Sequence, residues 1–458
     1  MLAATLAAYA AGAYGMASTD IRAQWNLSAV SFSFGITVFV LGFGFAPVLL
    51  ALISETYGRY WVFLGSGVVF CLGTVGCARS TSFGAMIASR LVTGCGAAVF
   101  ATLTGGVVSD LYAKEDRNAP MAVYSLFIMA GSGLGPLVSG QVVENLHWRW
   151  VFYIQIILIG ITTLGLFLVF SETRSNVLLR TNCATLNAHF ALLEKNAETS
   201  RGFTPCGSSE TRAPGLHFRC AAEVKQDAIG MTILNSFKFP FVLLATESIV
   251  FWFSLWIAFA WAILYMQFIS ISQAFGSVYH FNSAQVGAVY SAVVVGSILG
   301  FGASLAQDFI WRRLWPEKMR QPESRLHLAC VGSFCLPGGL FLFGWTSRPD
   351  VHWILPVFGI GIFTVGIFII YLAVFNYLAD AYGASSSSAQ AAQSMCRNLV
   401  AGVFPLFTTQ MFDKLGFGNG GSLLGGLALA LCAVPWVLVM FVNAIRRRSK
   451  FANGGQNL

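Results

Sequence analysis

Apolar runs of about twenty residues recur along this 458-residue chain, and they constrain its fold more than any other feature. A helix rises about 1.5 Å per residue, so about 20 apolar residues match the hydrocarbon core of a bilayer. Charged residues make up 10% of the chain, whereas a soluble domain has about 25%. We therefore predict an all-α membrane protein with twelve transmembrane helices. The predicted spans are Leu2–Thr19, Val30–Ile53, Trp61–Ala78, Phe83–Leu111, Met121–Val143, Trp150–Phe170, Thr246–Phe275, Ala284–Leu305, Leu328–Trp345, Trp353–Leu378, Ala389–Met411 and Ser422–Ile445.

Six of these spans lie on each side of a polar stretch, which divides the chain into two halves. The expected organisation is an N-terminal half (1–171), a central cytosolic loop (172–239), a C-terminal half (240–446) and a cytosolic tail (447–458). The central loop is too short and too poor in apolar periodicity to bury a core of its own. No nucleophile, base and orienting partner stand at usable spacing, so we do not expect an enzyme.

Basic residues predict the orientation of the spans. Of the 27 Lys and Arg residues, 20 fall in segments on the side of the two termini and five fall in the opposite loops. Because Lys and Arg near span ends stay on the cytosolic side, both termini are expected in the cytosol. The net charge of +8 then reflects topology, and we expect no nucleic-acid partner.

Cysteine and histidine give no indication of a metal site or a disulfide framework. The ten Cys residues fall in predicted spans or in the central loop, without a CxxC pair. The six His residues lack the H-x-x-x-H spacing of a zinc site. We expect no cofactor.

A short charged patch, Ser54–Arg59, lies between the second and third predicted spans. Its acid and base, Glu55 and Arg59, can each bond a neighbouring helix end, holding two helices together in one conformation and releasing them in another. The alternative is an ordinary solvated turn between two helices.

Two further features lie inside spans. Arg90 is placed well within the fourth span, where a guanidinium costs at least about 2.5 kcal/mol unless it meets a partner or a water-filled cavity. The alternative is an arginine that reaches the nearby membrane surface. In the fifth span, small residues precede Pro136, which removes a backbone hydrogen bond, so this helix is expected to bend or to pack tightly.

Four segments of the chain match known motifs in residue type and position. They are Ala51–Arg59, Arg90–Gly96, Gly135–Gly140 and Ser171–Arg174. In these segments the chain resembles the major facilitator superfamily, and within it the fungal branch of twelve-span drug:proton antiporters. The resemblance covers nearly the whole chain, with Ala51, Tyr60, Ser139 and Ser248 departing from the usual residues.

The resemblance implies two six-helix halves of inverted repeats that rock around a site near the bilayer midplane. It implies gating roles for residues of the loop and fifth-span motifs, and proton coupling through Arg90. A carboxyl raised in pKa by burial suits proton coupling, which points to Glu247 near the start of the seventh span; its alternative is an interfacial ion pair. The residues expected to gate are Glu55, Gly58, Arg59, Gly135, Pro136 and Gly140.

The resemblance also indicates which spans line the substrate cavity. Aromatic and amide side chains of these spans suit an amphipathic, ring-containing molecule, although aromatic residues in spans more often pack or face lipid. Arg397, deep in the eleventh span, balances a substrate charge or pairs with another helix. Few buried acids favour a neutral or weakly charged compound over a polyamine. The residues expected to bind substrate are Tyr14, Trp252, Trp256, Tyr290, Tyr371, Asn376, Gln393 and Arg397.

The resulting hypothesis is a monomeric, proton-driven exporter of small organic compounds in the plasma membrane of a fungus. Its partners are the substrate, protons and the lipid bilayer. One alternative is a proton-coupled uptake transporter for a nutrient or polyamine. Another is a non-transporting membrane receptor or a defective product, suggested by the altered loop motif and by a first span that starts at Met1 without a cytosolic tail.

Overall fold

The computed structural model describes residues 1–112, 116–200, 241–314, 326–382 and 386–448, and all regular elements in these ranges are helical. Eight helices precede the gap at residue 201. They are α1 (Leu2–Met16), α2 (Ser18–Trp25), α3 (Ala29–Tyr57), α4 (Arg59–Arg79), α5 (Phe83–Leu111), α6 (Asn118–Asn145), α7 (Trp150–Val169) and α8 (Ser175–Ser200).

The second part of the chain repeats this helical pattern. Its helices are α10 (Ser248–Val278), α11 (Ser283–Val289), α12 (Ser291–Leu314), α13 (His327–Gly332), α14 (Cys335–Thr346), α15 (Ile354–Tyr382), α16 (Ser386–Leu431) and α17 (Ala433–Arg448). Polar caps begin several of them. The Ser82 hydroxyl accepts from the Ala85 N–H at the start of α5, and Asn282 and Gln285 form a capping box at α11.

Ten helical segments of the described chain are long and apolar enough to cross a membrane. The apolar helix α1 adds one pass. The segment Ala389–Phe441 adds another, because it has 53 residues and turns at Gly416, where φ is +74°. The prediction of an all-α membrane protein with twelve transmembrane helices is confirmed.

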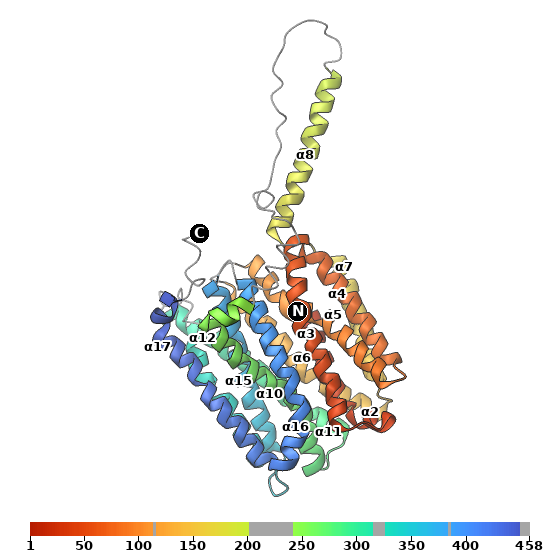
Figure 1. Ribbon diagram of the computed structural model, residues 1–458, viewed down its shortest axis with the longest axis vertical. Helices are drawn as coiled ribbons and strands as arrows, with labels where there is room; N and C mark the ends of the chain where they lie inside the picture. The colour runs from red at the N-terminus through yellow and green to blue at the C-terminus, as the bar shows by residue number, and fades with distance from the viewer. Residues whose placement is uncertain (113–115, 201–240, 315–325, 383–385, 449–458) are drawn as a thin grey trace.

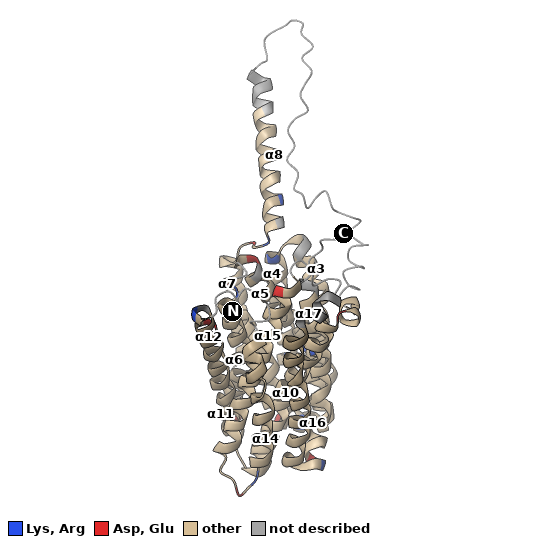
Figure 2. Ribbon diagram, turned by 90° about the vertical axis from the view of Figure 1, so that its left-hand side faces the viewer, with Lys and Arg blue, Asp and Glu red and all other residues tan. Residues whose placement is uncertain are grey.

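The outer surface of the bundle is apolar, as a lipid-facing surface must be. Large side chains such as Leu72, Ile161 and Leu168 are exposed on it, and few charged residues lie along the helices (Figure 2). Helices bond most of their backbone polar groups internally, which is the condition for crossing hydrocarbon. The bundle is therefore built for a bilayer.

The helices before residue 200 and those after residue 240 pack against each other along two seams. One seam joins α3 to α16, where the Thr37 hydroxyl donates to the Gly402 carbonyl at 2.7 Å. The other joins α6 to α11 and α12. There a Cβ on Gly140 would lie 2.5 Å from the carbonyl oxygen of Ser283, so only glycine permits the approach. Rocking of the halves would act along these seams.

The tight packing expected of the fifth span is confirmed. A Cβ on Gly135 would lie 2.5 Å from the Tyr9 carbonyl oxygen, and one on Gly12 would lie 2.8 Å from the Pro136 ring. Helices α1 and α6 therefore run in close backbone contact.

Helix α8 projects away from the bundle, beyond the end where α3 and α4 meet (Figure 1). We call this the α8 end, and the opposite end, where α2 and α11 lie, the far end. The sequence analysis predicts a central loop at 172–239, whereas the first part of this segment is the 26-residue helix α8. The remainder of the expected central loop (201–240) and most of the expected tail (449–458) lie outside the described residues.

Candidate functional site

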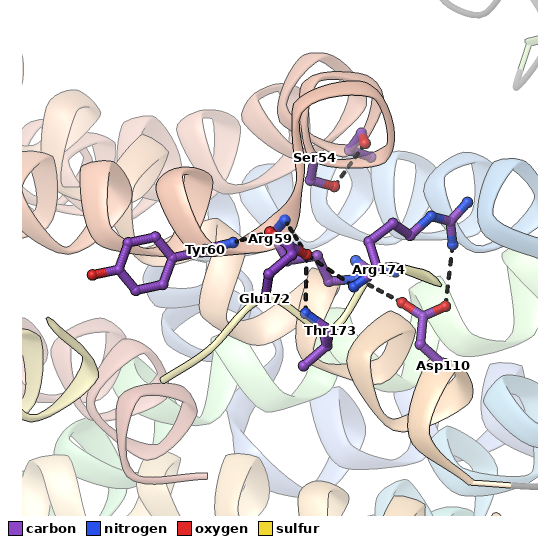
Figure 3. A network of polar contacts seen from close by, with 8 residues as sticks. Ser54, Arg59, Tyr60, Asp110, Glu172, Thr173 and Arg174 are labelled. Carbon is purple, nitrogen blue, oxygen red and sulfur yellow. Dashed lines mark hydrogen bonds and ion pairs between the residues drawn. The ribbon is translucent and has the colours of Figure 1, made fainter. Parts of the chain in front are cut away.

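A network of polar contacts joins four helix ends at the α8 end of the bundle (Figure 3). Arg59, the first residue of α4, is 4% exposed, and its Nε lies 2.7 Å from Oδ2 of Asp110 at the end of α5. The other carboxylate oxygen of Asp110 lies 3.1 Å from Nη1 of Arg174, which follows α7. One acid thus ties two arginines from separate segments to α5.

Glu172 adds a second junction to this network, through backbone donors only. Its carboxylate accepts from the N–H groups of Arg59 at 3.0 Å, Tyr60 at 3.1 Å, Thr173 at 3.0 Å and Arg174 at 2.8 Å. Partial burial opposes ionisation, but these four donors outweigh it and lower the pKa of Glu172 below its usual value. The start of α4 is a positive dipole end, which suits this anion.

Gly58 makes the network geometrically possible. It separates α3 from α4 with φ of +100°, a conformation that favours glycine, and a Cβ there would collide with the Glu172 carboxylate. Of the predicted gating pair, Arg59 lies in the network. Glu55 lies in the last turns of α3, and its side chain is outside the described part of the structure. The acid that meets Arg59 is Asp110, which sequence reasoning missed because 51 residues separate the two.

The middle of the bundle holds Arg90, which is 0% exposed. Its guanidinium lies 4.5 Å from the centroid of the Tyr14 ring and 4.4 Å from that of Phe39. It donates to the carbonyls of Ala10 at 3.1 Å and Gly35 at 3.3 Å. Arg90 is therefore enclosed by α1 and α3 and does not reach the membrane surface.

Arg397 of α16 is the second interior arginine, also 0% exposed. Its guanidinium lies over three rings, at 4.3 Å from Trp261, 5.3 Å from Tyr371 and 5.7 Å from Phe375. Trp261 and Tyr371 are themselves stacked, with centroids 5.1 Å apart. An aromatic box made by α10 and α15 thus surrounds this charge.

The structure buries most of the residues predicted to bind substrate. Tyr14 stacks on Phe32 at 4.6 Å, and the Tyr290 hydroxyl donates to the Gln267 carbonyl at 3.0 Å. The exception is Trp252, which is 47% exposed on the bundle surface. Those buried are Tyr14, Trp256, Tyr290, Tyr371, Asn376, Gln393 and Arg397.

Sequence reasoning missed an aromatic stripe on α10. The stripe consists of Trp261, Tyr265 and Phe268, which recur at the spacing of one helix face. The ring centroids of Trp261 and Tyr265 lie 6.4 Å apart, and those of Tyr265 and Phe268 lie 5.7 Å apart. This spacing is visible in the sequence and could have indicated the stripe.

Glu247 immediately precedes α10 near the α8 end, is 4% exposed, and accepts from the Tyr382 hydroxyl at 3.2 Å. It therefore contacts the end of α15, away from the interior arginines.

A polar cluster crosses between the halves near the α8 end. Asn118, at the start of α6, donates from its side-chain Nδ2 to the carboxylate Oδ2 of Asp308 of α12. Asn376 of α15 donates from its Nδ2 to the side-chain Oδ1 of Asn118. Asn118 and Asn376 are buried. We call these three residues the Asn118 latch; Asn376 was predicted to bind substrate, and the structure places it here.

The far end instead holds a cavity of about 290 Å³ between the halves. Gly15, Phe32 and Ser33 line it from the first half, and Phe268 and Ser272 from the second. Two of these lining rings continue toward the interior: Phe32 stacks on Tyr14, and Phe268 meets Tyr265. Within the described residues, His, Cys, Asp and Glu form no cluster suited to a metal ion.

Comparison with known proteins identifies a family and relatives that this chain resembles in sequence. The model of the Major Facilitator Superfamily matches residues 1–405. The MFS-type transporter phm3 of Pyrenochaetopsis is 32% identical over 423 residues, covering 92% of this chain and 82% of that protein. The efflux pump atB of Aspergillus terreus is 32% identical over 421 residues, covering 89% and 83%.

A solved structure shows the same fold at low sequence identity. The xylose transporter XylE from E. coli, in a partially occluded inward-open conformation, superposes with a TM-score of 0.61 at 14% identity, covering 96% of this chain and 97% of that one. This chain is a transporter and not an enzyme, and it belongs to the major facilitator superfamily.

Proposed function

We propose that this chain is a proton-coupled exporter of small organic compounds that works by alternating access in the plasma membrane. The observation that carries the proposal is the contrast between the two ends of the bundle. The Asn118 latch joins the halves near the α8 end, and the cavity of about 290 Å³ lies between them at the far end. A bundle closed at one end and hollow at the other is one of the two states that alternating access requires.

The basic residues support an orientation with the α8 end in the cytosol, by the same positive-inside rule that predicts both termini there. In this orientation the cavity faces outward, and substrate leaves through it. Relatives named as efflux pumps support export over uptake.

The charged network at the α8 end supports a gating role for Arg59 and Gly58. Because it ties α4, α5 and the segment after α7 to one another, it holds these helix ends of the first half in one arrangement, and a change of state at this end would have to rearrange it. Gly135, Pro136 and Gly140 act differently: they let α6 lie close to α1 and α11.

For the proton pathway we propose Glu247, whose buried carboxylate contacts Tyr382 near the closed end. This contact joins the start of α10 to the end of α15, so a change in it would accompany opening of the cytosolic side. Arg90 contributes a fixed positive charge in the interior.

The test is accumulation of a panel of fluorescent dyes and fungal toxins in yeast that lacks its own exporters. Cells expressing the chain should accumulate less of at least one compound, and a protonophore should abolish the difference. Glu247→Gln should lower the protonophore-sensitive part. Higher accumulation than in empty-vector cells would instead indicate uptake. Unchanged accumulation of every compound, with the protein at the cell surface, would count against export.

A further inference from the structure

The interior of the bundle carries positive charge that no described acid neutralises. The ion pairs of Arg59 and Arg174 with Asp110 lie at the α8 end, away from this interior charge. Arg90 and Arg397 are fully buried, and neither has a carboxylate within salt-bridge distance among the residues that the structure describes. A buried charge without a partner is costly, and proteins retain one chiefly where it has a use.

The hydrogen bonds of these two arginines are also incomplete. A guanidinium has five N–H donors and no acceptor. Arg397 places Nη2 3.3 Å from the Ser394 hydroxyl, while its Nε and Nη1 find no acceptor in the described structure. Arg90 likewise leaves Nη2 without one. Three buried guanidinium nitrogens therefore remain able to donate to a bound molecule, and Arg397 supplies two of them.

The walls around Arg397 suit a ring. Trp261 and Tyr371 stack on each other and present their rings to the guanidinium. The aromatic faces stabilise the charge by cation–π contact but do not neutralise it. The site thus combines flat apolar surface with donors that need an acceptor.

A run of rings connects Arg397 to the cavity. The Trp261 ring under Arg397 lies 6.4 Å from that of Tyr265, and the Tyr265 ring meets Phe268, which lines the cavity at the far end. On the opposite wall, Phe32 lines the cavity and stacks on Tyr14, which lies against Arg90. The field of both arginines therefore extends along the path between cavity and interior.

We propose that the interior site takes an organic anion, a ring-bearing weak acid whose carboxylate or enolate binds Arg397 while its ring packs against Trp261 and Tyr371. Arg90 supplies the second positive charge. The inference rests on the proposed export function and narrows its substrate class from the neutral or weakly charged compound expected from the sequence. An anion supplies both the charge and the acceptors that the site lacks, whereas a cation would meet two like charges.

The experiment compares three molecules that share one ring and differ in charge. They are 1-naphthaleneacetate, its neutral amide 1-naphthaleneacetamide, and the cation 1-naphthylmethylamine. Binding to the purified full-length chain in lipid nanodiscs is measured by isothermal titration calorimetry. We expect the acid to bind about tenfold more tightly than the amide, and the amine to bind most weakly.

Variants then assign the preference to Arg397. Arg397→Gln should weaken binding of the acid about tenfold and leave binding of the amide unchanged, while Arg397→Lys, which keeps the charge, should retain part of the preference. Arg348→Gln is the matched control, because Arg348 also lies over a tryptophan, Trp345, at 4.8 Å but is exposed at the far end. Unchanged thermal melting would show that each variant folds.

Equal affinity for acid and amide, including no measurable binding of either, would overturn the inference, as would a preference that survives in Arg397→Gln. The accumulation assay in yeast answers a separate question. Acid preference without export would refute the proposed export function and retain the anion site. Export without acid preference would refute the anion site and retain the export function.

Discussion

Two regions of this transporter bury arginine, and they treat it in opposite ways. At the α8 end, Arg59 meets Asp110 at 2.7 Å, and every member of the network has an oppositely charged or hydrogen-bonding partner. In the interior, Arg90 and Arg397 meet aromatic rings and keep nitrogens without acceptors. Paired charges specify one arrangement of helices. Buried charges without a described counter-ion are suited to an incoming molecule.

The largest expected effect comes from breaking the satisfied pair. Arg59→Ala leaves Asp110 with Arg174 alone, and loss of one partner from a pair in which only the arginine is buried costs about 2.5 kcal/mol, between the values for exposed and buried pairs. The arrangement of the first half at the α8 end is destabilised, so on the proposed function export in the yeast assay should fall strongly. Arg348→Ala is the control on the exposed far end.

A charge swap sharpens this prediction. Arg59→Asp combined with Asp110→Arg should recover part of the export that either single change removes, because the ion pair is restored in reverse. Absence of any recovery would show that Arg59 acts through another contact.

A smaller effect is expected at the Asn118 latch. Asn118→Ala removes the two hydrogen bonds that this residue makes to the second half and leaves Asp308 and Asn376 without this partner, at about 2 kcal/mol. The α8 end should then open more often. Opening is measured with Ser304→Cys, at a buried position lining the small cavity beside the latch. In inside-out vesicles, an impermeant maleimide should label the double variant Asn118→Ala/Ser304→Cys more than the single variant Ser304→Cys. Equal labelling of the two variants would contradict the latch.

Glu172 should affect stability only modestly and in a pH-dependent way. An amide offers one oxygen in place of the carboxylate's two, so Glu172→Gln should lower the free energy of unfolding by about 1 kcal/mol at pH 7, given partial exposure. The pKa of Glu172 is lowered in the folded state, so its contribution is complete above the unfolded value of about 4.3 and disappears as pH falls through the folded value.

The measurement is chemical denaturation of both proteins at pH 7 and near the folded pKa. The difference between them should shrink at the lower pH. A difference in unfolding free energy that grows as the pH falls would mean that the ionised carboxylate of Glu172 destabilises the folded protein.

The smallest effect is expected from Trp252→Leu. This ring is 47% exposed on the bundle surface, away from the aromatic box, so stability should change by no more than about 0.5 kcal/mol and export should be preserved. A loss of export as large as that of Arg397→Gln would show that Trp252 belongs to the substrate path after all.

Much of the fold was predictable because a bilayer forces a simple rule on sequence. Each crossing needs a long apolar helix, so the spans around Arg90, Pro136 and Glu247 were placed from the apolar runs alone. Helix α8 was missed, since its mixed polar and apolar residues match neither a span nor a soluble core. The turn at Gly416 falls between the eleventh and twelfth predicted spans.

The partners within the site were less accessible to sequence reasoning. Arg59 and Asp110 lie on different helices, and nothing in their separation of 51 residues indicates contact. On α10, Trp252 and Trp256 have similar neighbours in sequence, yet only Trp256 is buried. Which aromatic residues enter the interior depends on how α15 and α16 cover α10, which is a property of packing.

The two interior arginines also connect this carrier to the membrane voltage. One elementary charge crossing 100 mV changes energy by about 2.3 kcal/mol. On the proposed mechanism, rocking of a bundle in which no described acid neutralises the buried Arg90 and Arg397 would therefore be sensitive to the potential. An anion bound at Arg397 would cancel part of that charge, making the empty return step more voltage-dependent than the loaded one. Outward movement of an anion and inward movement of a proton both carry positive charge inward. An inside-negative potential would therefore drive the cycle in the same direction as the proton gradient.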